Sequence, residues 1–107
     1  MKKSAIKNTD KHSVEYSFSH CVERFKERYD RMLTREMYDL YNVEIIRFIN
    51  SDFKTSGALS LELVNKSLGT PTSYTVKIKD GCDIYASFEK ERNRITTLFP
   101  PESVKRK

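Results

Sequence analysis

Residues Ser19 to Tyr29 read SHCVERFKERY, and this stretch decides the first half of the fold. Placed at about 100° per residue, the apolar side chains fall on one stripe of a helix, made of Cys21, Val22, Phe25, Tyr29 and Met32. The basic side chains fall on the neighbouring stripe, made of His20, Arg24, Arg28 and Arg31. The pattern predicts an amphipathic helix that projects a histidine and arginines together beside an apolar seam.

Ser19 is well suited to cap the start of this helix. A serine at that position accepts a hydrogen bond from a backbone N–H of the first turn. His20 would then be the first helical residue, close to N–H groups that have no partner within the helix. The positive end of the helix dipole disfavours imidazolium, so we expect a neutral, base-like imidazole at His20.

The residues on either side of this helix predict two further elements. Residues 14–18 alternate apolar and polar side chains, which indicates a short strand or an extended lead-in. Thr34 is a good N-cap for a second helix, which residues 50–52 end. Within it, apolar side chains recur every three or four positions, at Met37, Leu40, Tyr41, Ile45, Phe48 and Ile49.

From residue 56 the apolar side chains alternate with polar ones, as in strands. A first strand ends before a loop at residues 65–72, and three more strands follow. Their alternating sets are Leu59, Leu61 and Leu63; Tyr74, Val76 and Ile78; Ile84, Ala86 and Phe88; and Ile95, Thr97 and Phe99. The predicted fold class is α+β, with two N-terminal helices packed on one face of a four-stranded antiparallel meander sheet.

The registers of the last two hairpins follow from keeping the apolar faces together. For the first, a loop of residues 79–81 with Gly81 left-handed is preferred to a two-residue turn, and it pairs Ile78 with Cys82 and Val76 with Ile84. For the second, a loop of residues 90–93 with Asn93 left-handed pairs Glu89 with Arg94, Phe88 with Ile95 and Ala86 with Thr97.

Length and charge predict one domain with basic ends. The chain has 107 residues and a net charge of +5, of which residues 1–13 carry +3 and residues 102–107 carry +2. We therefore expect a flexible basic arm at 1–13, a single α+β domain at 14–101 and a basic tail at 102–107. No stretch has the length and apolarity of a membrane span or a signal peptide, so a cytoplasmic location is expected.

Few chemistries suit this composition. Cys21 and Cys82 have no histidine or cysteine at ligand spacing, so we expect two buried apolar side chains, no disulfide and no metal site. The chain has only three glycines and no glycine-rich phosphate loop. Its acidic residues are scattered, unlike the carboxylate cluster of a two-metal nuclease. No cofactor is predicted.

The basic stripe His20, Arg24 and Arg28 suits phosphate chemistry. Arginine forks bind phosphate oxygens, and histidine is the side chain best matched to proton transfer near neutral pH. Cleavage of RNA by its own 2′-hydroxyl needs a base, an acid and cations for the developing charge. The structural interpretation of the same stripe is a solvated helix face whose charge Glu23 and Glu27 balance.

Two short motifs resemble a known family. The segment Ser19-His20…Arg24…Glu27-Arg28 is similar to the S-x-H-(x3)-R-(x2)-E-R type of opening helix. Thr97-Leu98-Phe99-Pro100 is similar to the closing T-x-[YF]-P strand of small toxins in the barnase, EndoU, colicin and RelE superfamily of RNases. The resemblance implies a metal-independent endoribonuclease with His20, Arg24 and Thr97 around the scissile phosphate and Arg28 as a further phosphate ligand.

The sheet supplies the remaining candidates. Thr97 stands in the row that should pack under the helices, where its hydroxyl would either bond locally or line a cleft that His20 also faces. Such toxins often carry more basic residues on the sheet than Lys77, Lys79 and Arg94. Tyr85 is the candidate extra acid or stacking group, although alternation predicts that Lys77 and Tyr85 face solvent and do not join His20.

Two functions from different classes remain open. The first is an RNase toxin whose partners are RNA and a cognate inhibitor protein, with no membrane partner. The second is a non-catalytic interaction protein, such as a phage-encoded or regulatory inhibitor, that binds a protein or nucleic acid through the sheet and the basic tails. They differ at His20, which an enzyme requires and a binding module does not.

Overall fold

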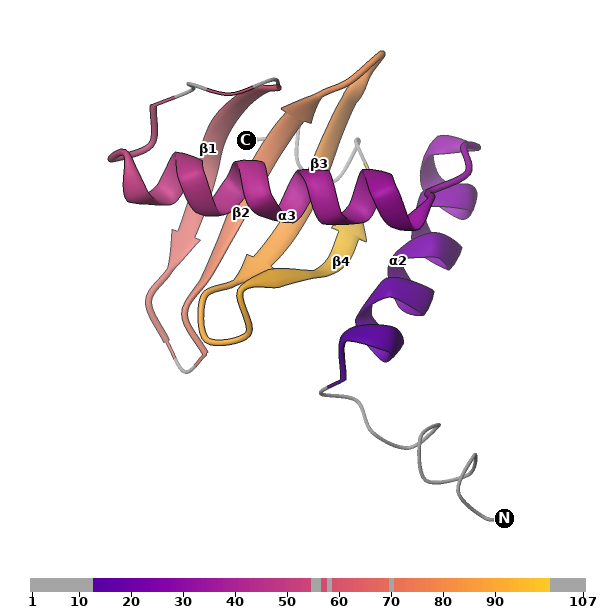
Figure 1. Cartoon of the computed structure of the whole chain (residues 1–107), viewed down its shortest axis with the longest axis horizontal. Helices are drawn as coiled ribbons and strands as arrows, with labels where there is room; N and C mark the ends of the chain where they lie inside the picture. Colours follow the sequence, from indigo (N-terminus) through magenta and orange to yellow (C-terminus); the bar gives the residue numbers. More distant parts are fainter. Residues whose placement is uncertain (1–12, 55–56, 58, 70, 101–107) are drawn as a thin grey trace.

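A computed structural model describes residues 13–54, 57, 59–69 and 71–100 (Figure 1). The predicted arm, apart from Ser13, and the predicted tail lie outside this range. The described elements are α2 (Val14–Tyr29), α3 (Arg35–Asn50), β1 (Ser60–Ser67), β2 (Ser73–Lys79), β3 (Asp83–Glu89) and β4 (Arg94–Phe99). The strands form one antiparallel sheet in the order β1-β2-β3-β4, which confirms the predicted α+β fold of two helices followed by a meander.

Helix α2 begins six residues earlier than the sequence indicated. Its N-cap is Ser13, whose side chain accepts a hydrogen bond from the backbone N–H of Tyr16 at 3.0 Å. Both the cap at Ser19 and the strand or extended lead-in at residues 14–18 are therefore wrong predictions. The alternation was misleading because the buried side chains of this helix recur every four residues, at Ser17, Cys21 and Phe25.

Helix α3 begins and ends as predicted. Thr34 accepts a hydrogen bond from the N–H of Met37 at 3.1 Å, which confirms it as the N-cap. Figure 1 shows α3 lying across the strands and α2 beside β4. The core between them contains Phe25, Tyr38, Tyr41, Ile45 and Phe48 from the helical half. Burying an isoleucine or phenylalanine side chain fully favours folding by about 1.5–3 kcal/mol.

The strands of the sheet turn one set of side chains toward this core and another set away from it. Buried core residues on β2, β3 and β4 are Tyr74, Val76, Ile78, Ile84, Ala86, Phe88, Ile95 and Leu98. We call the opposite side the outer face, which carries Thr75, Lys77, Tyr85, Ser87, Thr97 and Phe99. No described helix is long and apolar enough to cross a membrane.

The β2–β3 hairpin has a different register from the predicted one. Ile78 pairs with Ile84 and Val76 with Ala86, so the loop is residues 80–82 instead of 79–81. The side chain of Tyr41 donates to the Asp80 carboxylate at 2.6 Å, which ties this loop to α3. Gly81 is left-handed as predicted, with φ of 82°. The shift is by two residues in the pairing, and it therefore leaves the apolar faces together.

Two smaller differences concern strand length and a β-bulge. β1 continues to Ser67, into the stretch predicted as a loop. In the β3–β4 hairpin, Glu89 pairs with Arg94, Phe88 pairs with Ile95 and Asn93 has φ of 54°, all as predicted. Beyond Ile95, however, Thr96 is an extra residue, so Ala86 pairs with Leu98 and not with Thr97.

Side chains from the helices form hydrogen bonds with backbone groups of β4 and of its neighbour β3. The Ile95 carbonyl accepts a hydrogen bond from Tyr38 Oη at 2.7 Å, and the Ile95 N–H donates to Asn42 Oδ1 at 2.8 Å. The Tyr29 hydroxyl donates to the Phe99 carbonyl at 2.7 Å and accepts from the Tyr85 N–H at 2.9 Å. A sheet edge that would otherwise expose unpaired backbone groups is thereby covered, and α2 is fixed against β4.

Candidate functional site

The structure brings together the two segments that carry the family resemblance. His20 Nε2 lies 3.2 Å from Thr97 Oγ1, although the residues are 77 positions apart in the sequence. His20 lies on α2 and Thr97 lies on β4, the strand against which α2 packs. Either group can be the donor, because the role of the ring nitrogen depends on the tautomer.

The β-bulge at Thr96 determines where the Thr97 side chain points. Without the extra residue, alternation from Ile95 would place Thr97 in the row under the helices, as the sequence predicted. With it, Thr97 pairs with Ser87 and takes the outer face, while Leu98 takes the buried position. Thr97 therefore lies on the same sheet face as Lys77 and Tyr85, and the expectation that those two residues do not join His20 stays a prediction.

His20 is neutral at physiological pH for a reason other than the one predicted. It is the seventh residue of α2, so the N-terminal helix dipole does not act on it. Burial lowers the pKa of His20 below its usual value, and the positive charge of Arg24 lowers it further; Glu23 opposes this, and the effects of Arg28, which lowers the pKa, and Glu27, which raises it, are smaller. A neutral imidazole can accept a proton.

Arg24 and Arg28 lie one and two turns after His20 on α2, and both make contacts within the protein. Arg24 Nη1 is 2.6 Å from Glu27 Oε1, one turn further along the helix, and 25% of the Arg24 side chain is exposed. Arg28 donates to the backbone carbonyl of Leu98. Arg24 is thus a partly exposed, ion-paired cation at the helix surface, whereas Arg28 helps to hold α2 on β4.

Lys77 and Tyr85 are direct neighbours across β2 and β3 on the outer face. Lys77 Nζ lies 3.0 Å from Glu62 Oε1 on β1, and this ion pair raises the pKa of Lys77. Tyr85 is only 7% exposed, so the prediction that it faces solvent is wrong. It lies opposite Phe99 in the register of β3 and β4.

Tyr16 is a candidate that the sequence reasoning missed. Its ring is nearly parallel to the His20 ring, with an interplanar angle of 10° and centroids 6.2 Å apart. Tyr16 is 38% exposed. The signal was present in the sequence, because Tyr16, His20 and Arg24 recur every four residues, but it is visible only if the helix is known to start before Ser19.

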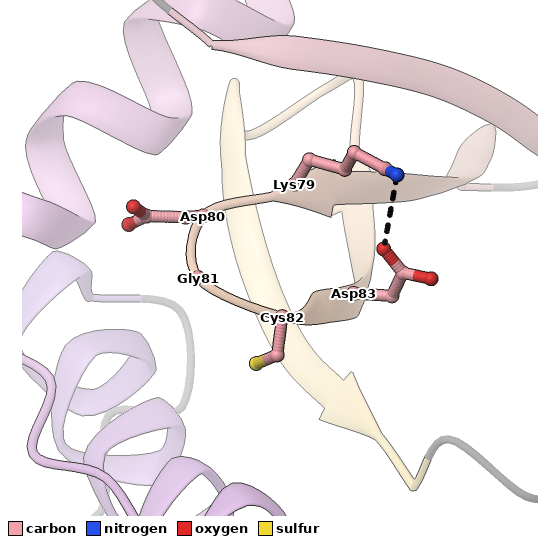
Figure 2. A pocket seen from close by; sticks show the side chains of 5 residues that line it. All are labelled: Lys79, Asp80, Gly81, Cys82 and Asp83. Carbon is pink, nitrogen blue, oxygen red and sulfur yellow. Dashed lines mark ion pairs between the residues drawn. The ribbon is translucent and has the colours of Figure 1, made fainter.

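A pocket of about 430 Å³ lies elsewhere, at the β2–β3 hairpin (Figure 2). Residues 79–83 line it, and Lys79 and Asp83 point to the same side, with Lys79 Nζ 3.9 Å from Asp83 Oδ1. Cys82 is exposed in the turn, which corrects the expectation of a buried thiol, while Cys21 is buried as expected. None of the residues predicted for the functional site lines this pocket.

In the described part of the chain, no three His, Cys, Asp or Glu side chains gather into a group that could hold a metal ion. Comparison of the whole chain with family models, curated proteins and solved structures found no match. The likeness to RNase toxins therefore rests on the two sequence motifs and on the contact between His20 and Thr97.

Proposed function

We propose that this protein is a cytoplasmic, metal-independent endoribonuclease of toxin type. The observation that carries the proposal is the 3.2 Å contact between His20 Nε2 and Thr97 Oγ1. Two side chains suited to a phosphate site, predicted from separate motifs, meet at the junction of α2 and β4. Arg24 lies one turn along the same helix and provides the nearby positive charge.

In this mechanism the neutral imidazole of His20 removes the proton from a ribose 2′-hydroxyl. The 2′-oxygen forms a bond to the adjacent phosphorus, and the bond from phosphorus to the 5′-oxygen breaks. Water protonates the departing 5′-oxygen, because Tyr85 is too buried to be the acid, and the hydroxide formed takes up the proton that His20 carries. The products are a 2′,3′-cyclic phosphate and a 5′-hydroxyl. Arg24 stabilises the charge that develops on the phosphate, and Thr97 orients the phosphate.

One observation favours the second candidate, a non-catalytic binding module. Arg24 bonds to Glu27 and Arg28 bonds to Leu98, as arginines of a purely structural helix face would. In that case His20 and Thr97 would form only a structural hydrogen bond between α2 and β4. The two candidates make opposite predictions for the His20 imidazole.

The test is incubation of the purified protein with total RNA in EDTA, followed by analysis of the RNA ends. We expect wild type to produce 2′,3′-cyclic phosphates and His20→Ala to be slower by about 10²- to 10⁴-fold, the usual contribution of a general base. Thr97→Val removes the hydroxyl at constant shape, and Thr97→Ser is its matched control. We expect the cleavage rate of Thr97→Val to be lower by about 2- to 12-fold, which corresponds to the loss of one hydrogen bond. The cleavage rate of Thr97→Ser should be close to that of wild type.

Circular dichroism must show that each variant is folded. Equal cleavage by wild type and His20→Ala would contradict the enzymatic proposal. So would the absence of cleavage by folded wild type together with capture of a partner that depends on residues 102–107 and not on His20, which is the outcome that the binding module predicts.

A further inference from the structure

We infer that Tyr16 is a stacking platform for an unpaired nucleobase, so that the ligand of this site is single-stranded RNA. This inference rests on the proposed function for the position of the phosphate, but its test does not require cleavage. It assigns a role to a residue that neither motif contains.

The geometry around His20 provides the first argument. The rings of Tyr16 and His20 lie 6.2 Å apart and almost parallel, within the range of 4.5–7 Å over which aromatic rings interact. The His20 ring nitrogen Nε2 is directed at Thr97, where the proposed phosphate is held. A nucleotide with its phosphate near Thr97 therefore has an aromatic surface within one helical turn of that phosphate.

Exposure provides the second argument. Tyr16 is 38% exposed on a helix whose other aromatic side chains face the core: Phe25 is fully buried, and Tyr29 bonds to β4. The Tyr16 backbone N–H donates to Ser13 Oγ at 3.0 Å, so the tyrosine ring is not needed for the cap. The Tyr16 ring is therefore partly open to a ligand.

The charges near Tyr16 also suit an anionic strand. Arg24 lies two turns away on the same stripe of α2. The neighbouring Glu15 is paired with Arg35 at 3.4 Å, so its negative charge is partly compensated. A strand passing from Tyr16 toward Arg24 would meet an aromatic surface first and a cation next, the combination that single-strand binding sites use.

Tyr16 can stack on a base only where the base is unpaired. In a duplex, each base is stacked and paired, and a side chain on the surface of a helix meets only the backbone or the groove edges. An unpaired base can leave its stack and lie flat on an aromatic ring. Tyr16 should therefore contribute to binding of single strands and not of duplexes.

The experiment measures fluorescence anisotropy of a short, labelled 2′-O-methyl RNA, which lacks the free 2′-hydroxyl and cannot be cleaved by the proposed route. The same strand annealed to its complement provides the duplex. The proteins are wild type, Tyr16→Ala, Tyr16→Phe and Val14→Ala. The last is a matched control on the same helix, since Val14 is 39% exposed and lies on a different side of α2.

We expect Tyr16→Ala to weaken binding of the single strand by roughly 5- to 150-fold, the range for losing one stacked base. Tyr16→Phe keeps the ring and should bind within about twofold of wild type. Val14→Ala should be unchanged, and all four proteins should bind the duplex alike. Alanine favours helix, so a loss through unfolding of α2 is not expected, and far-UV circular dichroism checks it.

Three results would overturn the inference: equal single-strand binding by wild type and Tyr16→Ala, an equal loss for single strand and duplex, or no single-strand binding by wild type. The failure of the proposed function gives a different pattern. If wild type binds the single strand through Tyr16 but never cleaves unmodified RNA, the platform stands and the RNase proposal falls. If wild type cleaves RNA but Tyr16→Ala binds the single strand normally, the RNase proposal stands and the inference about Tyr16 falls.

Discussion

Replacing Tyr29 with phenylalanine tests the way in which α2 is attached to the sheet. The change removes one oxygen atom that bridges two strands, donating to the Phe99 carbonyl at 2.7 Å and accepting from the Tyr85 N–H at 2.9 Å. Each hydrogen bond contributes about 0.5–1.5 kcal/mol net, so the expected loss in the free energy of unfolding is about 1–3 kcal/mol. Burial raises the pKa of Tyr29 to about 12, so the hydroxyl keeps its proton and this loss should be the same from acid to mildly alkaline pH.

The assay is urea unfolding followed by circular dichroism. The midpoint should fall while the slope with urea stays constant, because the folded and unfolded surfaces barely change. Tyr16→Phe removes a hydroxyl from an exposed tyrosine of the same helix and is the matched control. A loss for Tyr29→Phe no larger than that of the control, or below about 0.5 kcal/mol, would show that the bridge does not hold α2 on β4.

Three further predictions concern titration, backbone conformation and thiol access. Because the pKa of His20 is lowered in the folded state, the unfolded chain binds more protons near pH 6. The free energy of unfolding should therefore be constant above about pH 6.5 and fall as the pH drops from there toward the lower folded pKa. Urea unfolding of His20→Gln should not show this fall. Gly81→Ala forces a side chain onto φ of 82° and should lower the free energy of unfolding by about 1 kcal/mol, whereas Gly69→Ala, which meets nothing within 4 Å, should change it by less than about 0.5 kcal/mol in the same assay. Ellman's reagent should titrate one thiol in the folded protein, the exposed Cys82, and two in urea, because Cys21 is buried and its pKa is raised to about 12. Two fast thiols in the native protein would contradict the placement of Cys21.

The order of elements could be predicted from the sequence because long periodic segments signal their own structure. Thr34, the spacing of apolar residues in α3 and the alternation in the strands all act locally, and they were sufficient for an α+β meander. The start of α2 was misplaced, because the earlier start places Ser17 on the helix as a buried residue that contacts β4, and such a long-range contact is not visible in the local pattern. Arg94 Nε donates to Ser17 Oγ at 3.0 Å, a contact between residues 77 positions apart.

The candidate site was predicted in part. Pairing of His20 with Thr97 was suggested by family resemblance, but the face that Thr97 occupies depends on the β-bulge at Thr96. Nothing in a run of two threonines distinguishes a bulge from a regular strand. The bulge is favoured because it places Leu98, which is 1% exposed, in the core opposite Ala86. Tertiary packing thus sets the orientation of the site, and local pattern alone gave the opposite result.

The pairing of α2 with β4 also governs when the site can exist during synthesis. The helix that carries His20 leaves the ribosome first among the described elements, and the strand that carries Thr97 leaves last. Until β4 emerges, a nascent chain offers the histidine no hydroxyl partner and offers α2 no strand to pack on. Under the proposed RNase function, this order would delay assembly of the reactive centre until the domain has been translated, so that the ribosome making it is not exposed to a complete site.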